Sequence, residues 1–276
     1  MPTFLRKRRD FIARDTVRRS LAVITESSRQ GASPHSTFVS EQLPPLDQTD
    51  CPDLFGSPVP VEVVNSDTLV IARKIMNYDE DAVGNVAVLN LADDIRPAGS
   101  WFLHEMLHVR QTPTTRFPNV GSGSTVGVYS PGVVIFKDQL QNACADLPPN
   151  QRRVVSVISV AAPRWPELSD DGRSFRRHSD VEDLREKIRL VYRMAAHNEK
   201  RYLVLDHEFT YDDIGAMGCG SYECPPEQVA REMKDVLLEP EFRGWFKQIV
   251  FAVLSTANNG PRDFEVFRDT FSGVRV

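Results

Sequence analysis

The sequence predicts an α/β protein in which a mixed or parallel sheet is covered by helices on both faces. Short apolar runs at 86–91, 154–162 and 249–254 are typical of strands buried on both faces. Amphipathic stretches lie between them, and 178–198 repeats its apolar residues at helical spacing. Strands that alternate with helices favour this fold class.

Length and composition restrict the type of protein. A chain of 276 residues suits one α/β core, expected at 60–276, with an extension at 1–59. The net charge of −5 argues against a general or sequence-specific nucleic-acid binder. No apolar run is long enough to span a membrane, no signal peptide is recognisable, and the four cysteines show no paired spacing. These features predict an intracellular protein, cytoplasmic or nuclear, without a membrane partner.

The extension contains two different segments. Residues 5–29 are expected to form a helix that packs on the core, and its cluster Arg6-Lys7-Arg8-Arg9 is either a nuclear localisation signal or a solvated helix face. Residues 30–59 are rich in proline and predict a linker or an extended wrapping segment without an element. Further strands are expected at 61–64 and 202–205 and, as two short strands around a Pro-Gly turn, within 127–136. Further helices are expected from Leu69, at 227–238 and at 263–271.

A glycine-rich loop, 215–222, lies between a buried strand and a helix that starts at Pro225-Pro226. Its three glycines allow the backbone to approach a ligand closely, and the dipole of the following helix favours an anion. The loop therefore indicates a phosphate or diphosphate site, although a structural turn would explain the glycines equally well.

The stretch 86–112 combines a strand, an irregular loop and a second apolar run that holds His104, Glu105, His108 and Arg110. A strand that leads into a glycine-containing loop and then a helix is where α/β proteins bind ligands. A ligand-binding site is therefore expected within this stretch.

Seven segments in this order resemble the microbial-type poly(ADP-ribose) glycohydrolase family, whose core is a three-layer macrodomain. They are the Arg-rich N-terminal helix, 61–69, 86–92, 128–138, 157–163, 215–222, and 249–254 with 264–271. The resemblance implies a macrodomain-like mixed sheet with helices on both faces. It also implies a protein that recognises ADP-ribose or ADP-ribosylated macromolecules and needs no cofactor.

The resemblance also implies the ligand contacts. Gly218, Cys219, Gly220, Ser221 and Tyr222 would surround the diphosphate, with the Tyr222 ring near the distal ribose. Asn90 and the loop after it, with Gly99 and Ser100, would surround that ribose. Asp67 would meet the amino group of adenine.

The catalytic segment departs from the family pattern of three glycines followed by Gln-Glu-Glu. The glycines are replaced by Ala98-Gly99-Ser100, and either 104–106 or 108–110 aligns with Gln-Glu-Glu. In both registers the second glutamate is absent, so the general acid that glycosidic cleavage requires is missing. The resemblance thus implies weak or altered glycohydrolase activity, with Glu105 the remaining candidate for catalysis.

A second interpretation of the same residues stays open. His104-Glu-Met-Leu-His108 matches HExxH, in which two histidines on one helix face bind zinc and the glutamate acts as general base. A zinc-dependent hydrolase or metallopeptidase is therefore the alternative. A third interpretation is an amphipathic helix with two surface histidines.

Overall fold

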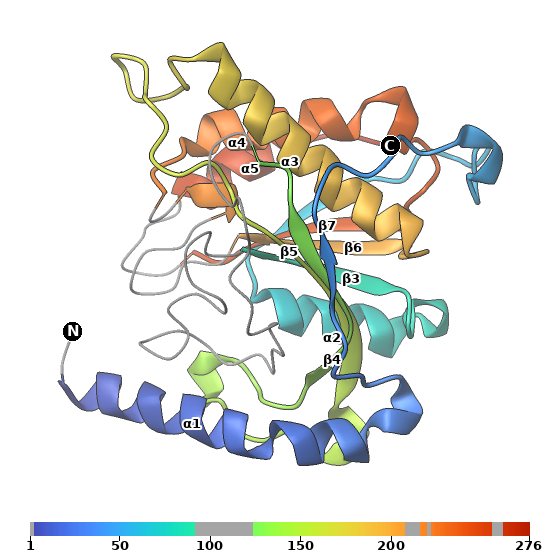
Figure 1. Cartoon of the computed structure of the whole chain (residues 1–276), viewed down its shortest axis with the longest axis vertical. Helices are drawn as coiled ribbons and strands as arrows, with labels where there is room; N and C mark the ends of the chain where they lie inside the picture. Colours follow the sequence, from blue (N-terminus) through green and yellow to red (C-terminus); the bar gives the residue numbers. More distant parts are fainter. Residues whose placement is uncertain (1–2, 92–123, 208–215, 220–221, 256–261) are drawn as a thin grey trace.

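The computed structural model describes residues 3–91, 124–207, 216–219, 222–255 and 262–276. Within these residues, seven strands form one mixed sheet in the order β1-β4-β5-β3-β6-β7-β2. Strands β5, β3, β6, β7 and β2 are mutually parallel, and β4 runs antiparallel to both β5 and β1. Figure 1 shows α2 on one face of this sheet and α3, α4 and α5 on the other. The predicted α/β fold with helices on both faces is confirmed.

The strands are β1 (Thr37–Val39), β2 (Val61–Val64), β3 (Val86–Leu91), β4 (Gly127–Ile135), β5 (Arg153–Val160), β6 (Tyr202–His207) and β7 (Gln248–Val253). The α-helices are α1 (Thr3–Glu26), α2 (Thr68–Tyr78), α3 (His178–His197), α4 (Pro226–Leu237) and α5 (Arg262–Phe271). Helix α4 begins at Pro226, as its sequence predicts, because the first-turn N–H groups have no partner within a helix.

The central strands β3 and β6 begin with apolar residues on both faces because each of them contributes to two cores. In β3, Val86 and Val88 pack under α2, whereas Ala87 and Leu89 belong to the larger core under α3, α4 and α5. Strand β6 alternates in the same way. This is the expected consequence of the period-two direction of strand side chains in a sheet that is covered on both faces.

Two expectations for the strands are wrong. The segment 127–135 is one strand rather than two, because the Pro-Gly pair is accommodated by a register shift between Ser130 and Val133. The proline-rich segment 30–59 does contain an element, since Thr37–Val39 pairs with β4 at the edge of the sheet. A three-residue edge strand carries too little periodicity to be recognised in a sequence.

Helix α1 packs against the far end of β4. Val23 and Ile24 contact Val134 and Phe136 in a small separate core. Nearby, Lys137 Nζ lies 2.8 Å from a carboxylate oxygen of Asp146 and 3.3 Å from Asp15, and Arg19 pairs with the other Asp146 oxygen. Charged contacts therefore attach the helix at its middle, and apolar contacts attach it at its end.

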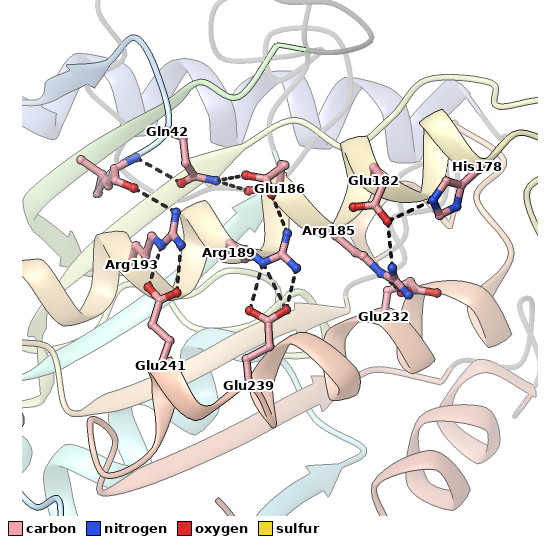
Figure 2. Close-up of polar contacts among 11 residues, drawn as sticks. Gln42, His178, Glu182, Arg185, Glu186, Arg189, Arg193, Glu232, Glu239 and Glu241 are labelled. Atoms are coloured by element: carbon pink, nitrogen blue, oxygen red, sulfur yellow. Dashed lines mark hydrogen bonds and ion pairs between the residues drawn. The ribbon is translucent and has the colours of Figure 1, made fainter. Parts of the chain in front are cut away.

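Three arginines spaced four residues apart along α3 form an ion-pair ladder (Figure 2). Arg193 makes two bonds to Glu241, of 2.7 and 2.9 Å, and donates to the Leu43 carbonyl. Arg189 pairs with Glu239 and Glu186 in the same manner, and Arg185 pairs with Glu232 and Glu182. The ladder ties the N-terminal segment near Leu43, and the segment after α4, to the same helix.

We expect Glu241→Ala to lower the free energy of unfolding by about 3 kcal/mol. The substitution leaves the Arg193 guanidinium, whose side chain is only 8% exposed, without its bidentate partner. Urea denaturation measures the change. Asp269→Ala, which removes an exposed pair with Arg268, is the matched control and should change stability little.

The same pair predicts a pH dependence. Burial raises the pKa of Glu241, but hydrogen bonds from Arg193 and from the Leu46 N–H outweigh it and hold the pKa below its ordinary value of 4.5. The unfolded carboxylate is then protonated first as the pH falls, so the contribution of the pair is complete above that value and is lost below it. The stability difference between wild type and Glu241→Ala should therefore shrink on acidification. A difference that stays constant down to about pH 3 would contradict this assignment.

Candidate functional site

The carboxyl ends of five parallel strands lie in a row along one edge of the sheet, in the order β2, β7, β6, β3 and β5 (Figure 1). Ligands of open α/β sheets bind outside this edge. Asp67 follows β2, Asn90 lies in β3, and the turn at Gly218 follows β6. The topology therefore brings together three predicted site residues that are far apart in the sequence.

Asp67 is the N-cap of α2, and its side chain accepts a hydrogen bond of 2.9 Å from the Val70 N–H. Its side chain is nearly inaccessible to solvent. Burial raises the pKa of the Asp67 carboxyl, and the charge of Asp138 adds to this effect, whereas the N–H groups of Val70 and Leu69 and the charge of Arg73 oppose it. A carboxylate that is costly to bury gains from each additional donor, and the amino group of adenine is such a donor.

Asp138 and Arg73 were not predicted as site residues. They form an ion pair of 3.5 Å near Asp67, and Asp138 also accepts bonds from Asn142 and from the Gln139 N–H. The sequence shows Asp138 only as the last residue of the segment 128–138. Its proximity to Asp67 depends on the path of the chain after β4.

Asn90 lies near the carboxyl end of β3, in register with Ser159 of β5. Its amide nitrogen donates to Ser159 Oγ over 2.8 Å, and the residue is buried. This bond fixes the orientation of the amide near the carboxyl edge of the sheet.

The turn at Gly218 requires glycine. Its φ is +93°, and a Cβ added there would lie 2.8 Å from Cys224 Sγ and 2.9 Å from Ala162 Cβ. Met217 before it also has a positive φ, of 35°. The Gly218 carbonyl accepts the Cys224 N–H over 2.9 Å, which fixes the two ends of the segment 218–224. The backbone here follows a path that no residue with a side chain could take without displacing its neighbours.

Both thiols of this segment stay protonated at neutral pH. Burial raises the pKa of both Cys219 and Cys224, and the carboxylates of Asp263 and Glu227 add to the effect at Cys219. Cys224 Sγ donates to the Pro163 carbonyl. Neither thiol therefore brings a negative charge to a segment that is expected to meet a diphosphate.

Tyr222 is held by two residues that were not predicted from the sequence. Arg164 lies with its guanidinium carbon 4.4 Å from the centre of the Tyr222 ring and donates from Nη2 to the Tyr222 hydroxyl over 2.8 Å. The Trp165 N–H donates to the Tyr222 carbonyl over 2.9 Å. The run Pro163-Arg-Trp-Pro166, directly after the clear strand at 154–160, was the available signal.

A buried charged pair in α3 contacts Ser124, the first described residue before β4. Lys187 lies 3.3 Å from Asp183, both side chains are 5% exposed, and Lys187 Nζ also donates to the Ser124 carbonyl. Asp183 is close enough to Cys224 to contribute to its raised pKa. The first half of α3 therefore contacts Ser124 and lies near the segment after Gly218.

The other predicted site residues lie outside the described part of the chain. They are Gly99, Ser100, His104, Glu105, His108, Gly220 and Ser221. Among the described residues no group of three His, Cys, Asp or Glu side chains is placed to hold a metal ion. The zinc interpretation of His104 and His108 stays a prediction that these residues do not test. No α-helix within the described ranges is long and apolar enough to cross a membrane.

Comparison with solved structures identifies the fold. A poly(ADP-ribose) glycohydrolase from Thermomonospora curvata is 21% identical, with a TM-score of 0.67 over 95% of this chain and 98% of that one. The poly(ADP-ribose) glycohydrolase from Thermomonospora curvata bound to the inhibitor ADP-HPD is 22% identical, with a TM-score of 0.66 over 95% of this chain and 98% of that one. The poly(ADP-ribose) glycohydrolase from Deinococcus radiodurans in complex with ADP-ribose is 24% identical, with a TM-score of 0.57 over 76% of this chain and 83% of that one.

The chain therefore has the fold of poly(ADP-ribose) glycohydrolase, and the resemblance of its seven segments to that family is confirmed at the level of the fold. No family model matches the sequence, and no curated protein matches it. The fold likeness gives the metallopeptidase alternative no support.

Proposed function

We propose that the protein binds ADP-ribose groups at the carboxyl edge of its sheet, with the adenine at Asp67 and the diphosphate at 218–222. The turn at Gly218 carries this proposal. It follows β6 at the carboxyl edge of the sheet, in a chain with the fold of proteins described as poly(ADP-ribose) glycohydrolases, one of which is in complex with ADP-ribose. A Cβ at Gly218 would meet Cys224 and Ala162, so this glycine lets the turn pack against its own neighbours, and the turn leads directly into the segment proposed to meet the diphosphate.

The strand order supports the direction of the ligand. Asp67 follows β2, the Gly218 turn follows β6, and Asn90 lies in β3, so that the three positions succeed one another along the edge of the sheet. ADP-ribose has the same order of parts, which are adenine, diphosphate and distal ribose. A ligand that lies along the edge would meet the Asp67 carboxylate, which accepts hydrogen bonds, then the turn at Gly218, and then the Asn90 amide.

The catalytic part of the proposal is weak or altered ADP-ribosyl glycohydrolase activity. In the sequence, the second glutamate of the family pattern is replaced by Met106 in one register and by Arg110 in the other. Neither side chain can donate a proton to the leaving oxygen as a carboxylic acid does. The protein would then recognise ADP-ribose groups more effectively than it cleaves poly(ADP-ribose).

Calorimetry tests the binding. We expect wild-type protein to bind ADP-ribose with a stoichiometry of one and to bind AMP more weakly, because AMP lacks the second phosphate and the distal ribose. Equal affinity for both would contradict the placement of the diphosphate and ribose. No heat at millimolar ADP-ribose would contradict the binding itself.

A further inference from the structure

Trp165 is a large aromatic side chain presented to solvent beside the proposed site. It is 62% exposed and lies five residues beyond Val160, the buried last residue of β5. Its φ is +48°, which is rare for a residue with a bulky side chain and costs energy. The bond from its N–H to the Tyr222 carbonyl holds this backbone in place. Backbone strain of this kind clusters at functional sites, so the strained backbone of the exposed Trp165 indicates a functional role.

Arg164 fixes the neighbouring side chains rather than the backbone. Its guanidinium carbon lies 5.2 Å from the centre of the Trp165 ring and 4.4 Å from that of Tyr222, so that it contacts both rings. Each cation–π contact at a partly exposed position contributes modest stabilisation. Arg164 therefore acts as a positioning residue that couples Trp165 to the aromatic expected near the distal ribose.

The strand order determines which part of a ligand reaches Trp165. Along the edge, β5 follows β3 on the side away from β6. A ligand with its diphosphate after β6 and its distal ribose at β3 therefore points its next group towards the segment after β5. That segment includes Ala162, which borders Gly218, and continues into Arg164 and Trp165.

We propose that Trp165, positioned by Arg164, forms a stacking subsite for the purine of a second ADP-ribose unit. This inference rests on the proposed function. In poly(ADP-ribose) the distal ribose of one unit is joined to the adenosine ribose of the next, so a purine follows the ribose. A tryptophan face is a strong stacking partner for a base and does not depend on hydrogen bonds. The subsite would favour polymer over isolated ADP-ribose.

The test compares ADP-ribose with a two-unit fragment of poly(ADP-ribose) by calorimetry, with the integrity of the fragment checked by chromatography. We expect wild type to bind the fragment roughly 5- to 100-fold more tightly than ADP-ribose. Trp165→Ala should remove this advantage and leave the affinity for ADP-ribose unchanged. Trp165→Phe should keep most of it, because phenylalanine retains a stacking face.

Three controls make the outcome decisive. Both Trp165 variants keep a Cβ at the positive φ, so they share any backbone effect. Phe55→Ala removes an aromatic that is 96% exposed in the segment between β1 and β2 and should change neither affinity. A peptide that carries one ADP-ribose group lacks the second purine and should not respond to Trp165→Ala.

The subsite is contradicted if wild type binds both ligands equally, or if Trp165→Ala weakens both to the same extent. If Trp165→Ala weakens binding of the ADP-ribosylated peptide but not of the two-unit fragment, Trp165 contacts the peptide part of the ligand rather than a second purine. If neither ligand binds wild type, the proposed function fails and the subsite fails with it.

Discussion

Gly220→Glu should reduce ADP-ribose binding by at least about 100-fold. Gly220 is two residues after Gly218, whose backbone already excludes a Cβ, and two residues before the buried Tyr222. A glutamate there adds a side chain and a negative charge where the proposal requires close approach to a diphosphate. Like charges at short distance in a partly desolvated site cost several kcal/mol, which is of the order of the expected loss.

Two variants separate the causes of that loss. Gly220→Gln has nearly the same shape without the charge, so it should bind more weakly than wild type and more tightly than Gly220→Glu. Gly84→Glu introduces the same residue before β3, at the opposite edge of the sheet, where a Cβ meets nothing within 4 Å; because its φ of +81° strains any side chain, its stability is measured beside its affinity. Retained affinity in Gly220→Glu, with normal circular dichroism, would show that the diphosphate lies elsewhere.

Met106→Glu should raise the rate of ADP-ribose release from poly(ADP-ribose) by up to about 10² to 10⁴-fold. In the register that aligns residues 104–106 with Gln-Glu-Glu, Met106 occupies the position of the missing second glutamate. A carboxyl group there would supply the general acid for the leaving oxygen. The rate is measured as released ADP-ribose, with the Thermomonospora curvata poly(ADP-ribose) glycohydrolase assayed beside it as the reference.

Matched variants determine which register and which carboxylate matter. Arg110→Glu is the corresponding change in the other register, and only one of the two should gain activity. Glu105→Gln tests the remaining candidate for catalysis, and a slow background that is equal in this variant and in wild type would support a degenerate site. Rapid release by wild type that Glu105→Gln abolishes would contradict the proposed weak activity and make Glu105 the catalytic residue.

Local sequence patterns were sufficient for most of the fold. The apolar spacing of 178–198 predicts α3 within one residue, and the two prolines at 225–226 predict the start of α4. The strand β1 could not be predicted, because three residues at a sheet edge gain their stability from β4, which lies almost ninety residues later. The register shift in β4 likewise depends on pairing with β5 rather than on the Pro-Gly pair alone.

The structural roles of two candidate residues follow from local patterns, whereas their roles towards a ligand stay predictions. Asp67 precedes the helix that it caps, and Gly218 belongs to a glycine cluster after a strand, which is typical of a turn. Arg164 was not recognised, because its partner Tyr222 is 58 residues away and the contact exists only in the folded sheet. The exposure and positive φ of Trp165 are also properties that a sequence does not display.

The central claim is that ADP-ribose lies along the carboxyl edge of the sheet, and a crystal structure of the protein with ADP-ribose tests it most directly. We expect adenine beside Asp67, the diphosphate against 218–222, and the distal ribose at Asn90 with its C1″ directed towards Trp165. Density for the ligand on any other surface, or its absence from this edge after soaking at millimolar concentration, would contradict the account.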